Sequence, residues 1–294
     1  KQLLKKYPDI FIKTKQIFIH RIKDFILNKS DELMIFIFVS LKMVAYYGNY
    51  LLIVNKIILL MNVVSDGMGA GVGNLVAEGN HKNTMKVFWE LTAIRFYVTG
   101  IVCFGLLYFT ETFITIWLGA EYVLNHWILY LLVFYLFVMF TRGVVQMYIH
   151  SYGLYADTWS AWLEVILNLS ITILCASQWG ILGILLGKVI SSTLIALFWK
   201  PYYLYRDGFH LTCWDYWRGM LPHYLMFFLP IALFYPLVHG VVLPNIDGFL
   251  SFLLNVGWSV AIYALTYLII LYFCTTGMKH FLCRIPIVNQ WLNR

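Results

Sequence analysis

Several polar and charged side chains lie inside long apolar stretches of this sequence. Such groups cost at least a few kcal/mol at bilayer depth, so they usually face a bundle interior or a water-filled cavity. Arginine and lysine there would suit anionic groups, whereas amide and carboxyl side chains would suit hydroxyl groups. The candidates for a polar cavity are Arg142, Arg95, Asp66, Asn62, Gln146, Glu164, Asn168 and Lys188.

One apolar stretch carries an extended polar stripe. Asn55, Asn62, Asp66, Gly69 and Gly73 follow one another at intervals of 7, 4, 3 and 4 residues, which places them on one helical face. The stripe favours a cavity at Asp66. The asparagines and glycines are also typical of close packing and hydrogen bonding between membrane helices, and the sequence leaves both interpretations open.

The charged candidates offer alternative ion pairs. Glu164 is a possible partner of Lys188 or of Arg142, and the sequence does not choose between them. If such an ion pair forms, Glu164 and its partner would neutralise each other instead of binding a ligand. Arg95 and Arg142 also lie within a few turns of an expected span end, so either side chain can instead snorkel toward the interface.

The elements that position these groups are expected to be membrane helices. The chain is 61% hydrophobic and 12% charged, whereas about 25% of the residues in a soluble domain are charged. Apolar runs that approach the roughly 20 residues needed to cross a bilayer predict an all-α bundle of about eight transmembrane helices. The expected spans are residues 31–49, 50–77, 87–118, 124–150, 158–176, 179–199, 220–240 and 247–276.

Lysine and arginine are distributed asymmetrically between the connectors. Of the 21 Lys and Arg residues, all those outside the expected spans lie on one side, and the alternate connectors contain none. Positive residues in short loops mark the cytoplasmic face, which predicts two cytoplasmic termini and an even number of crossings. The net charge of +7 then faces anionic lipid, and nucleic-acid binding is not expected.

The segments outside the spans suggest a simple organisation. Residues 1–30 are expected to form an amphipathic interfacial lead-in, because Ile19, Ile22 and Ile26 share a helical face. The alternative is a longer first span that begins near Gln16 and carries Asp31 into the bilayer. Residues 201–219, rich in aromatics, are expected to form a cytoplasmic connector between six spans and two.

Motifs for enzymatic chemistry are not found in the sequence. The alternating glycines at positions 67, 69, 71 and 73 lack the G-x-G-x-x-G spacing and favour close packing or a bendable helix end. Gly183 and Gly187 form the G-x-x-x-G pattern of close helix contact. The five cysteines and eight histidines show no metal-ligand spacing. A non-enzymatic protein without a metal or cofactor is expected.

Several ordered features resemble a known family. Arg142 precedes a polar helix end, Glu164 and Asn168 are one turn apart, and Gly180 and Gly183 open the next apolar run. Together with the segments 18–22 and 46–74, the run 141–206 resembles Wzx-type polysaccharide or O-antigen flippases of the multidrug/oligosaccharidyl-lipid/polysaccharide exporter superfamily. The resemblance covers more than half of the chain. Lys188 departs from it, standing where a small or hydroxyl residue is expected.

The resemblance implies a bacterial inner-membrane transporter built from two six-helix lobes, sometimes with two appended helices. Residues 31–200 would form the second lobe and residues 220–294 the appended pair with a cytoplasmic tail. A chain that does not begin with Met is expected to be part of a longer protein, whose missing N-terminal lobe would be a partner.

The implied substrate is an undecaprenyl-pyrophosphate-linked oligosaccharide, flipped for the synthesis of cell-surface polysaccharide such as lipopolysaccharide. Arg142, Arg95 and Lys188 would neutralise the diphosphate, and the polar residues would bind sugar hydroxyls. The alternatives are a membrane-embedded glycosyltransferase or polymerase, and a cation-coupled drug exporter of the same superfamily.

Overall fold

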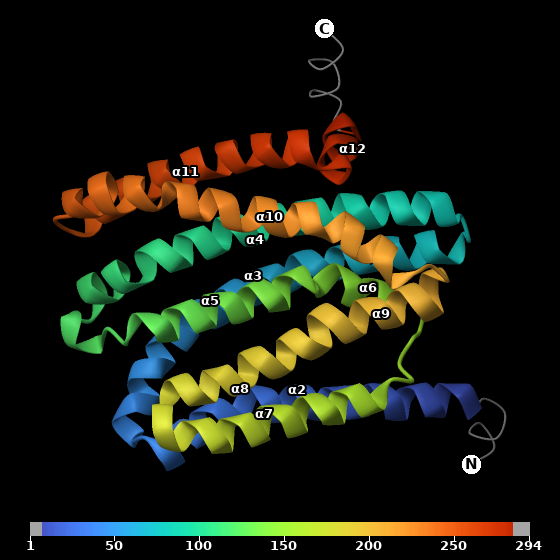
Figure 1. Ribbon diagram of the computed structural model, residues 1–294, viewed down its shortest axis with the longest axis horizontal. Helices are drawn as coiled ribbons and strands as arrows, with labels where there is room; N and C mark the ends of the chain where they lie inside the picture. Colours follow the sequence, from blue (N-terminus) through green and yellow to red (C-terminus); the bar gives the residue numbers. More distant parts are fainter. Residues whose placement is uncertain (1–7, 285–294) are drawn as a thin grey trace, which may run out of the picture. The chain divides into compact units, whose positions relative to one another are not determined.

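The computed structural model describes residues 8–284, without the side chains of residues 8, 9, 64 and 66. Every regular element within this range is helical (Figure 1). In chain order they are α2 (Pro8–Phe38), α3 (Leu41–Ala77), α4 (His81–Trp117), η1 (Ala120–Tyr122), α5 (His126–Thr141), α6 (Gly143–Ser151), α7 (Thr158–Trp179), α8 (Ile181–Thr193), η2 (Leu194–Trp199), α9 (Lys200–Leu204), η3 (Tyr205–Phe209), α10 (Cys213–Leu237), η4 (Val238–Val242), η5 (Leu243–Asn245), α11 (Phe249–Cys274) and α12 (Thr276–Arg284).

The prediction of an all-α, multi-pass membrane bundle is confirmed. Within the described range, seven helical runs are long and apolar enough to cross a bilayer. α2 adds a further helix of 31 residues, which at about 1.5 Å per residue also exceeds the thickness of the hydrocarbon layer. The seven runs are Leu41–Ala77, His81–Trp117, His126–Ser151, Thr158–Trp179, Ile181–Phe209, Cys213–Asn245 and Phe249–Cys274.

The prediction of a first span over residues 31–49 is wrong. α2 ends at Phe38 and α3 begins at Leu41, so a turn divides the expected span. The Ser40 hydroxyl oxygen accepts a hydrogen bond of 3.2 Å from the backbone N–H of Met43, which caps the start of α3. Residues 8–30 form one helix with the segment that follows, so the longer alternative helix is the one observed. Residues 1–7 of the predicted lead-in lie outside the described range.

The chain contains two compact units. The first comprises Lys1–Asn74 and Leu124–Leu211, and the second comprises Leu75–Val123 and Thr212–Arg294. α4 therefore groups with α10, α11 and α12 rather than with the other helices of the expected lobe. The predicted division of the chain into residues 31–200, 201–219 and 220–294 is based on the family resemblance and not on contacts between helices. It stays a prediction.

The first unit is organised around a tight hairpin of α7 and α8. Gly180 has a φ of +55° in the turn between them, a conformation that glycine adopts without steric cost. A Cβ at Gly183 would collide with the backbone at Cys175, and one at Gly187 would collide with Thr172. The predicted close contact at this G-x-x-x-G pattern is confirmed. Figure 1 shows α2 running beside α7.

The second unit is held together by aromatic side chains. The rings of Phe104 in α4 and Tyr263 in α11 stack with centroids 4.1 Å apart. Gly100 leaves the space that the Tyr267 ring fills. The Tyr108 hydroxyl donates a hydrogen bond of 2.7 Å to the carbonyl oxygen of Ile231 in α10. These contacts join the three long helices α4, α10 and α11.

The alternating glycines of α3 make no close contact. Cβ atoms built at positions 67, 69, 71 and 73 would meet nothing within 4 Å among the described residues, and α3 continues to Ala77. The predicted close packing of these glycines is therefore not seen among the described residues.

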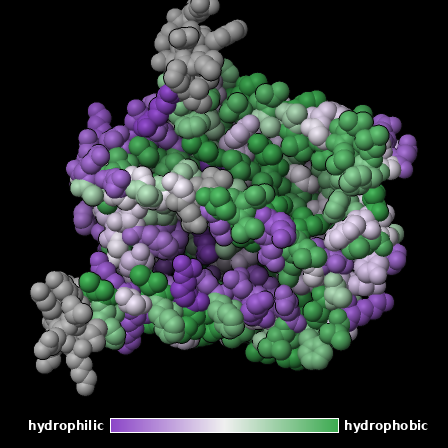
Figure 2. All heavy atoms as spheres, turned by 180° about the vertical axis from the view of Figure 1, so that it is seen from behind, coloured by the Kyte–Doolittle hydropathy of each residue, from purple (hydrophilic) through white to green (hydrophobic). Residues whose placement is uncertain are grey.

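Figure 2 shows one face of the molecule on which hydrophobic side chains cover large areas and hydrophilic ones gather in separate groups.

Candidate polar cavity of the first unit

A cavity of about 450 Å³ lies within the first unit, among α2, α3, α5, α7 and α8. Its wall contains five basic and four acidic side chains, an unusual density for a protein in which only 12% of residues are charged. The charged residues are Arg21, Lys23, Asp24, Lys29, Asp31, Glu32, Arg142, Glu164 and Lys188.

Asp31 and Lys188 form the most enclosed ion pair of this cavity. Their Oδ2 and Nζ atoms are 2.5 Å apart, and both side chains are buried. The Tyr47 hydroxyl donates a hydrogen bond of 3.3 Å to the same carboxylate oxygen. The Lys188 ammonium also lies 4.6 Å from the centre of the Tyr135 ring, a favourable cation–π distance. One ion pair thus connects α2, α3, α5 and α8.

A second buried ion pair joins α2 to α7. Lys23 Nζ lies 3.1 Å from Glu164 Oε2 and 2.9 Å from Asp24 Oδ1. Glu164 therefore pairs with neither Lys188 nor Arg142, the two partners considered from the sequence. Removing Lys23 would leave the buried Glu164 carboxylate without compensation, whereas removing Glu164 would leave Lys23 with Asp24 as its only carboxylate partner.

A third charged cluster lies where α7 begins. Asp157 is 2.6 Å from Lys200 Nζ and 3.5 Å from His20 Nε2, and it accepts hydrogen bonds from Ser160 and Trp199. Burial alone would raise the pKa of Asp157, but the neighbouring His20 ring and the Lys200 charge outweigh it and lower this pKa to about 2. The carboxylate is therefore ionised at neutral pH.

The three clusters share one face of α2. His20, Lys23, Leu27, Asp31 and Ile35 are separated by three or four residues, the spacing that keeps side chains on one side of a helix. Lys23, Asp31 and Ile35 are buried. α2 thus presents a charged stripe to α7 and α8, and its membership of the bundle depends on ion pairing as well as apolar packing.

Arg142 lies at an irregularity between α5 and α6. The Thr141 hydroxyl donates to the carbonyl oxygens of Phe137 and Val138, at 2.7 and 3.3 Å. Such back-bonding bends helices, and Gly143 follows directly. Arg142 is half-buried and lines the cavity, and no carboxylate pairs with it among the described residues.

The structure brings together four of the eight predicted site residues, namely Asn62, Arg142, Glu164 and Lys188. Gln146 instead lies 2.7 Å from His150 through their side-chain nitrogens. Asn168 is buried beside Gly187, and its amide nitrogen has no hydrogen-bond partner among the described residues. Arg95 is buried in α4 of the second unit, and the Asp66 side chain lies outside the described residues.

Sequence reasoning missed the partners of the buried charges. The sequence pattern places Lys23 in an expected interfacial segment and indicates no role for Asp157 or Lys200. The signal that could have found Lys23 and Asp31 is their helical spacing with His20 along one face of an apolar segment. The partners of Lys23 and Asp31, which are Glu164 on α7 and Lys188 on α8, could not be predicted. The pattern of a single sequence does not show which helices contact each other.

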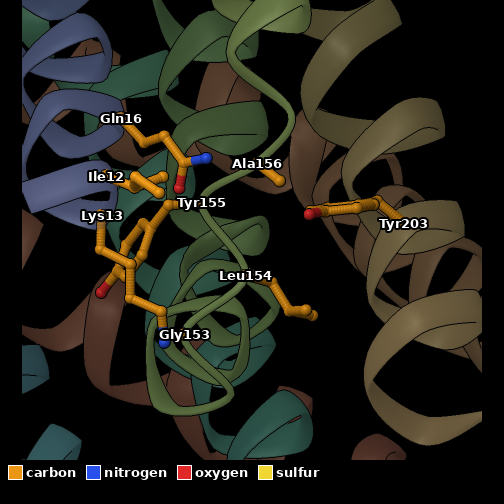
Figure 3. A pocket seen from close by; sticks show the side chains of 8 residues that line it. All are labelled: Ile12, Lys13, Gln16, Gly153, Leu154, Tyr155, Ala156 and Tyr203. Carbon is orange, nitrogen blue, oxygen red and sulfur yellow. The ribbon is translucent and has the colours of Figure 1, made fainter. Parts of the chain in front are cut away.

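A smaller cavity of about 310 Å³ is lined by residues 153–156, the loop that directly precedes Asp157 and α7 (Figure 3). Residues of α2 and of α9 complete its wall. The Lys13 ammonium lies against Gly153, where φ is +65° and a Cβ would be 2.9 Å from Nζ. Tyr203 of α9 points toward Ala156. The cavity extends the polar surface of α2 beyond the Asp157 cluster.

The comparisons with known proteins found no relative of this chain. No family model matches the chain, and neither a curated protein nor a solved structure matches it. Within the described range no group of three or more His, Cys, Asp or Glu side chains could hold a metal ion. The wall of the first-unit cavity offers ammonium, guanidinium, carboxylate and amide groups.

Proposed function

We propose that this chain takes part in moving a lipid-linked oligosaccharide across a membrane, with the first-unit cavity receiving the anionic headgroup. One observation carries the proposal. Arg142, Arg21 and Lys29 all line the cavity and have no ion pair among the described residues, while the other two cations are held by carboxylates. Positive groups free to bind a ligand thus surround a polar space inside an apolar bundle.

A diphosphate is the group that this arrangement suits. Phosphate oxygens accept charge-assisted hydrogen bonds from guanidinium and ammonium groups, and these bonds are stronger where water is scarce. Asn55 and Asn62 lie on the α3 side of the same cavity and offer amide groups to sugar hydroxyls. The polyprenyl chain, which is apolar, would remain in the hydrocarbon layer.

The fixed ion pairs have a different part in this proposal. Asp31–Lys188 and Lys23–Glu164 hold α2 against α7 and α8, so the cavity wall keeps its shape while a ligand binds. Alternating access requires a second bundle that moves against the first. The partner proposed for that movement is the other six-helix lobe implied by the family resemblance.

The setting proposed for this activity is the bacterial inner membrane, with both termini cytoplasmic. The apolar helices are compatible with any membrane, and the charge asymmetry of the connectors supports this orientation.

The functional test is export in a flippase-deficient bacterium that also expresses the proposed partner lobe. Surface glycan and accumulated lipid-linked precursor are measured for the unaltered chain, Arg142→Glu, Arg142→Lys and the control Arg206→Glu. Arg206 lies outside the cavity and pairs with its neighbour Asp207 at 2.6 Å. We expect export to fail with Arg142→Glu and to persist in part with Arg142→Lys, because a mobile diphosphate needs charge more than fork geometry. Normal export by well-inserted Arg142→Glu protein would remove Arg142 from the mechanism.

A further inference from the structure

A separate polar cavity of about 340 Å³ lies within the second unit. It is formed by α4, α10 and the junction of α11 with α12. Its wall includes Trp89, Asp215, Arg218, His223 and Thr276. None of these residues lines the first-unit cavity, and the proposed transport of a diphosphate gives them no role.

His223 carries an unused hydrogen-bonding atom in this wall. The side chain is only 4% exposed. Its Nδ1 lies 3.0 Å from the carbonyl oxygen of Gly219, and because a carbonyl only accepts, Nδ1 carries the proton. Nε2 of the neutral ring is then an acceptor, and it has no partner among the described residues. A buried acceptor without a donor is costly, so this atom indicates a ligand that donates a hydrogen bond.

The aromatic wall beside His223 is fixed by close helix packing. The Trp89 and His223 rings stack at 18°, with centroids 6.0 Å apart. A Cβ added at Gly219 would collide with the Trp89 ring, and one at Gly277 would collide with the Trp89 backbone. Trp89 is therefore held between α10 and α12. An indole ring is the aromatic surface that most favours a neighbouring cation.

The rest of the wall carries one group of each charge. Asp215 and Arg218 are three residues apart, which places them on one face of α10. Asp215 Oδ2 accepts a hydrogen bond of 2.7 Å from Thr212, and Arg218 has no ion pair among the described residues. Thr276 is the first residue of α12, where backbone N–H groups and the helix dipole favour an anion.

We propose that this cavity binds a zwitterionic headgroup consisting of a phosphate and a primary ammonium, as in phosphatidylethanolamine. The phosphate faces Arg218 and the start of α12. The ammonium donates a hydrogen bond to His223 Nε2, faces the carboxylate of Asp215 and lies near Trp89. A choline headgroup has no N–H to donate, and a phosphoglycerol headgroup places no positive charge beside Asp215. Both are disfavoured for these reasons.

The test is native mass spectrometry of the full chain in detergent, with phosphatidylethanolamine, phosphatidylcholine and phosphatidylglycerol of the same acyl composition. We expect retention of the ethanolamine lipid to exceed that of either other lipid by about tenfold or more, because only its headgroup combines an N–H donor with a positive charge. His223→Leu and Asp215→Asn should each abolish this preference. The matched controls are His280→Leu and Asp247→Asn, at exposed positions of the same unit outside the cavity.

Added glycerophosphoethanolamine distinguishes a lipid from a soluble source of the same headgroup. If it displaces the lipid only at large excess, the lipid is the ligand. Binding of the soluble compound alone, lost in both cavity variants, supports the headgroup site and assigns it to a free ligand. Equal retention of all three lipids by folded unaltered protein, or an ethanolamine preference unchanged in folded Asp215→Asn and His223→Leu, overturns the proposal. Asp215 is exposed, so its variant tests the site even if His223→Leu does not fold.

Discussion

Lys188 of α8 and Asp31 of α2 form a buried ion pair of 2.5 Å across 157 positions of the sequence. Each would be an unfavourable charge in an apolar bundle without the other. Because Tyr47 and Tyr135 also contact this pair, it fixes the mutual positions of four helices. The first-unit cavity is therefore a consequence of paired charges that hold apolar helices in register.

The Asp31–Lys188 pair should show strong energetic coupling. We expect Asp31→Asn or Lys188→Met alone to destabilise the protein by about 3–5 kcal/mol, because each leaves one buried charge uncompensated. The double variant should recover most of this loss. Reversible unfolding in detergent, monitored by tryptophan fluorescence, provides the double-mutant cycle, and the exposed cavity residue Lys29→Met is the control. Additive single effects would contradict a direct ion pair.

The partner of Glu164 can be identified by suppression. Glu164→Gln should destabilise the bundle by leaving Lys23 buried without its carboxylate on α7. Adding Lys23→Met should restore stability, whereas adding Lys188→Met or Arg142→Met should not. The measurement is the folded fraction after heating, for the three double variants side by side. Rescue through Lys188 or Arg142 instead would show that α2 packs in another register.

The Asp157 cluster predicts a pH dependence of stability at acid pH. Its carboxyl pKa falls from 3.8 to about 2 in the folded chain, so the folded state favours the ionised form. The resulting contribution of about 2 kcal/mol is complete above the unfolded pKa and is lost as pH falls through the folded one. Trp199 donates a hydrogen bond of 3.1 Å to Asp157, so its fluorescence should report this loss. The dependence between pH 4 and pH 2 should flatten in Asp157→Asn, and an unchanged slope would contradict the assignment.

Orientation can be tested at the two ends of α4. In a background without other cysteines, we expect Ala120→Cys to react with an impermeant thiol reagent added outside intact cells, and Glu78→Cys to react only after permeabilisation. Both positions are exposed, and α4 between them is 37 residues long. The reverse pattern would overturn the orientation drawn from the Lys and Arg distribution.

The sequence predicted the helical class well because apolar runs of sufficient length leave few alternatives. It failed at α2 because Lys23 and Asp31 interrupt the hydropathy signal, although both charges are neutralised by partners far along the chain. Four of the eight predicted site residues line one cavity. The pairing of Glu164 could not be predicted, since helical spacing shows which residues share a face but not which helix lies opposite.

The most direct test of the central claim is equilibrium binding of undecaprenyl diphosphate to the purified full chain, compared with undecaprenol, which has the same tail without phosphate. We expect the diphosphate to bind about tenfold or more tightly than the alcohol, and Arg142→Glu to abolish that difference, because the charged headgroup supplies the selectivity. Arg206→Glu should leave the difference intact. Equal binding of the two lipids by folded protein, or a preference for the diphosphate that survives in Arg142→Glu, would contradict a headgroup site centred on Arg142 in the first-unit cavity.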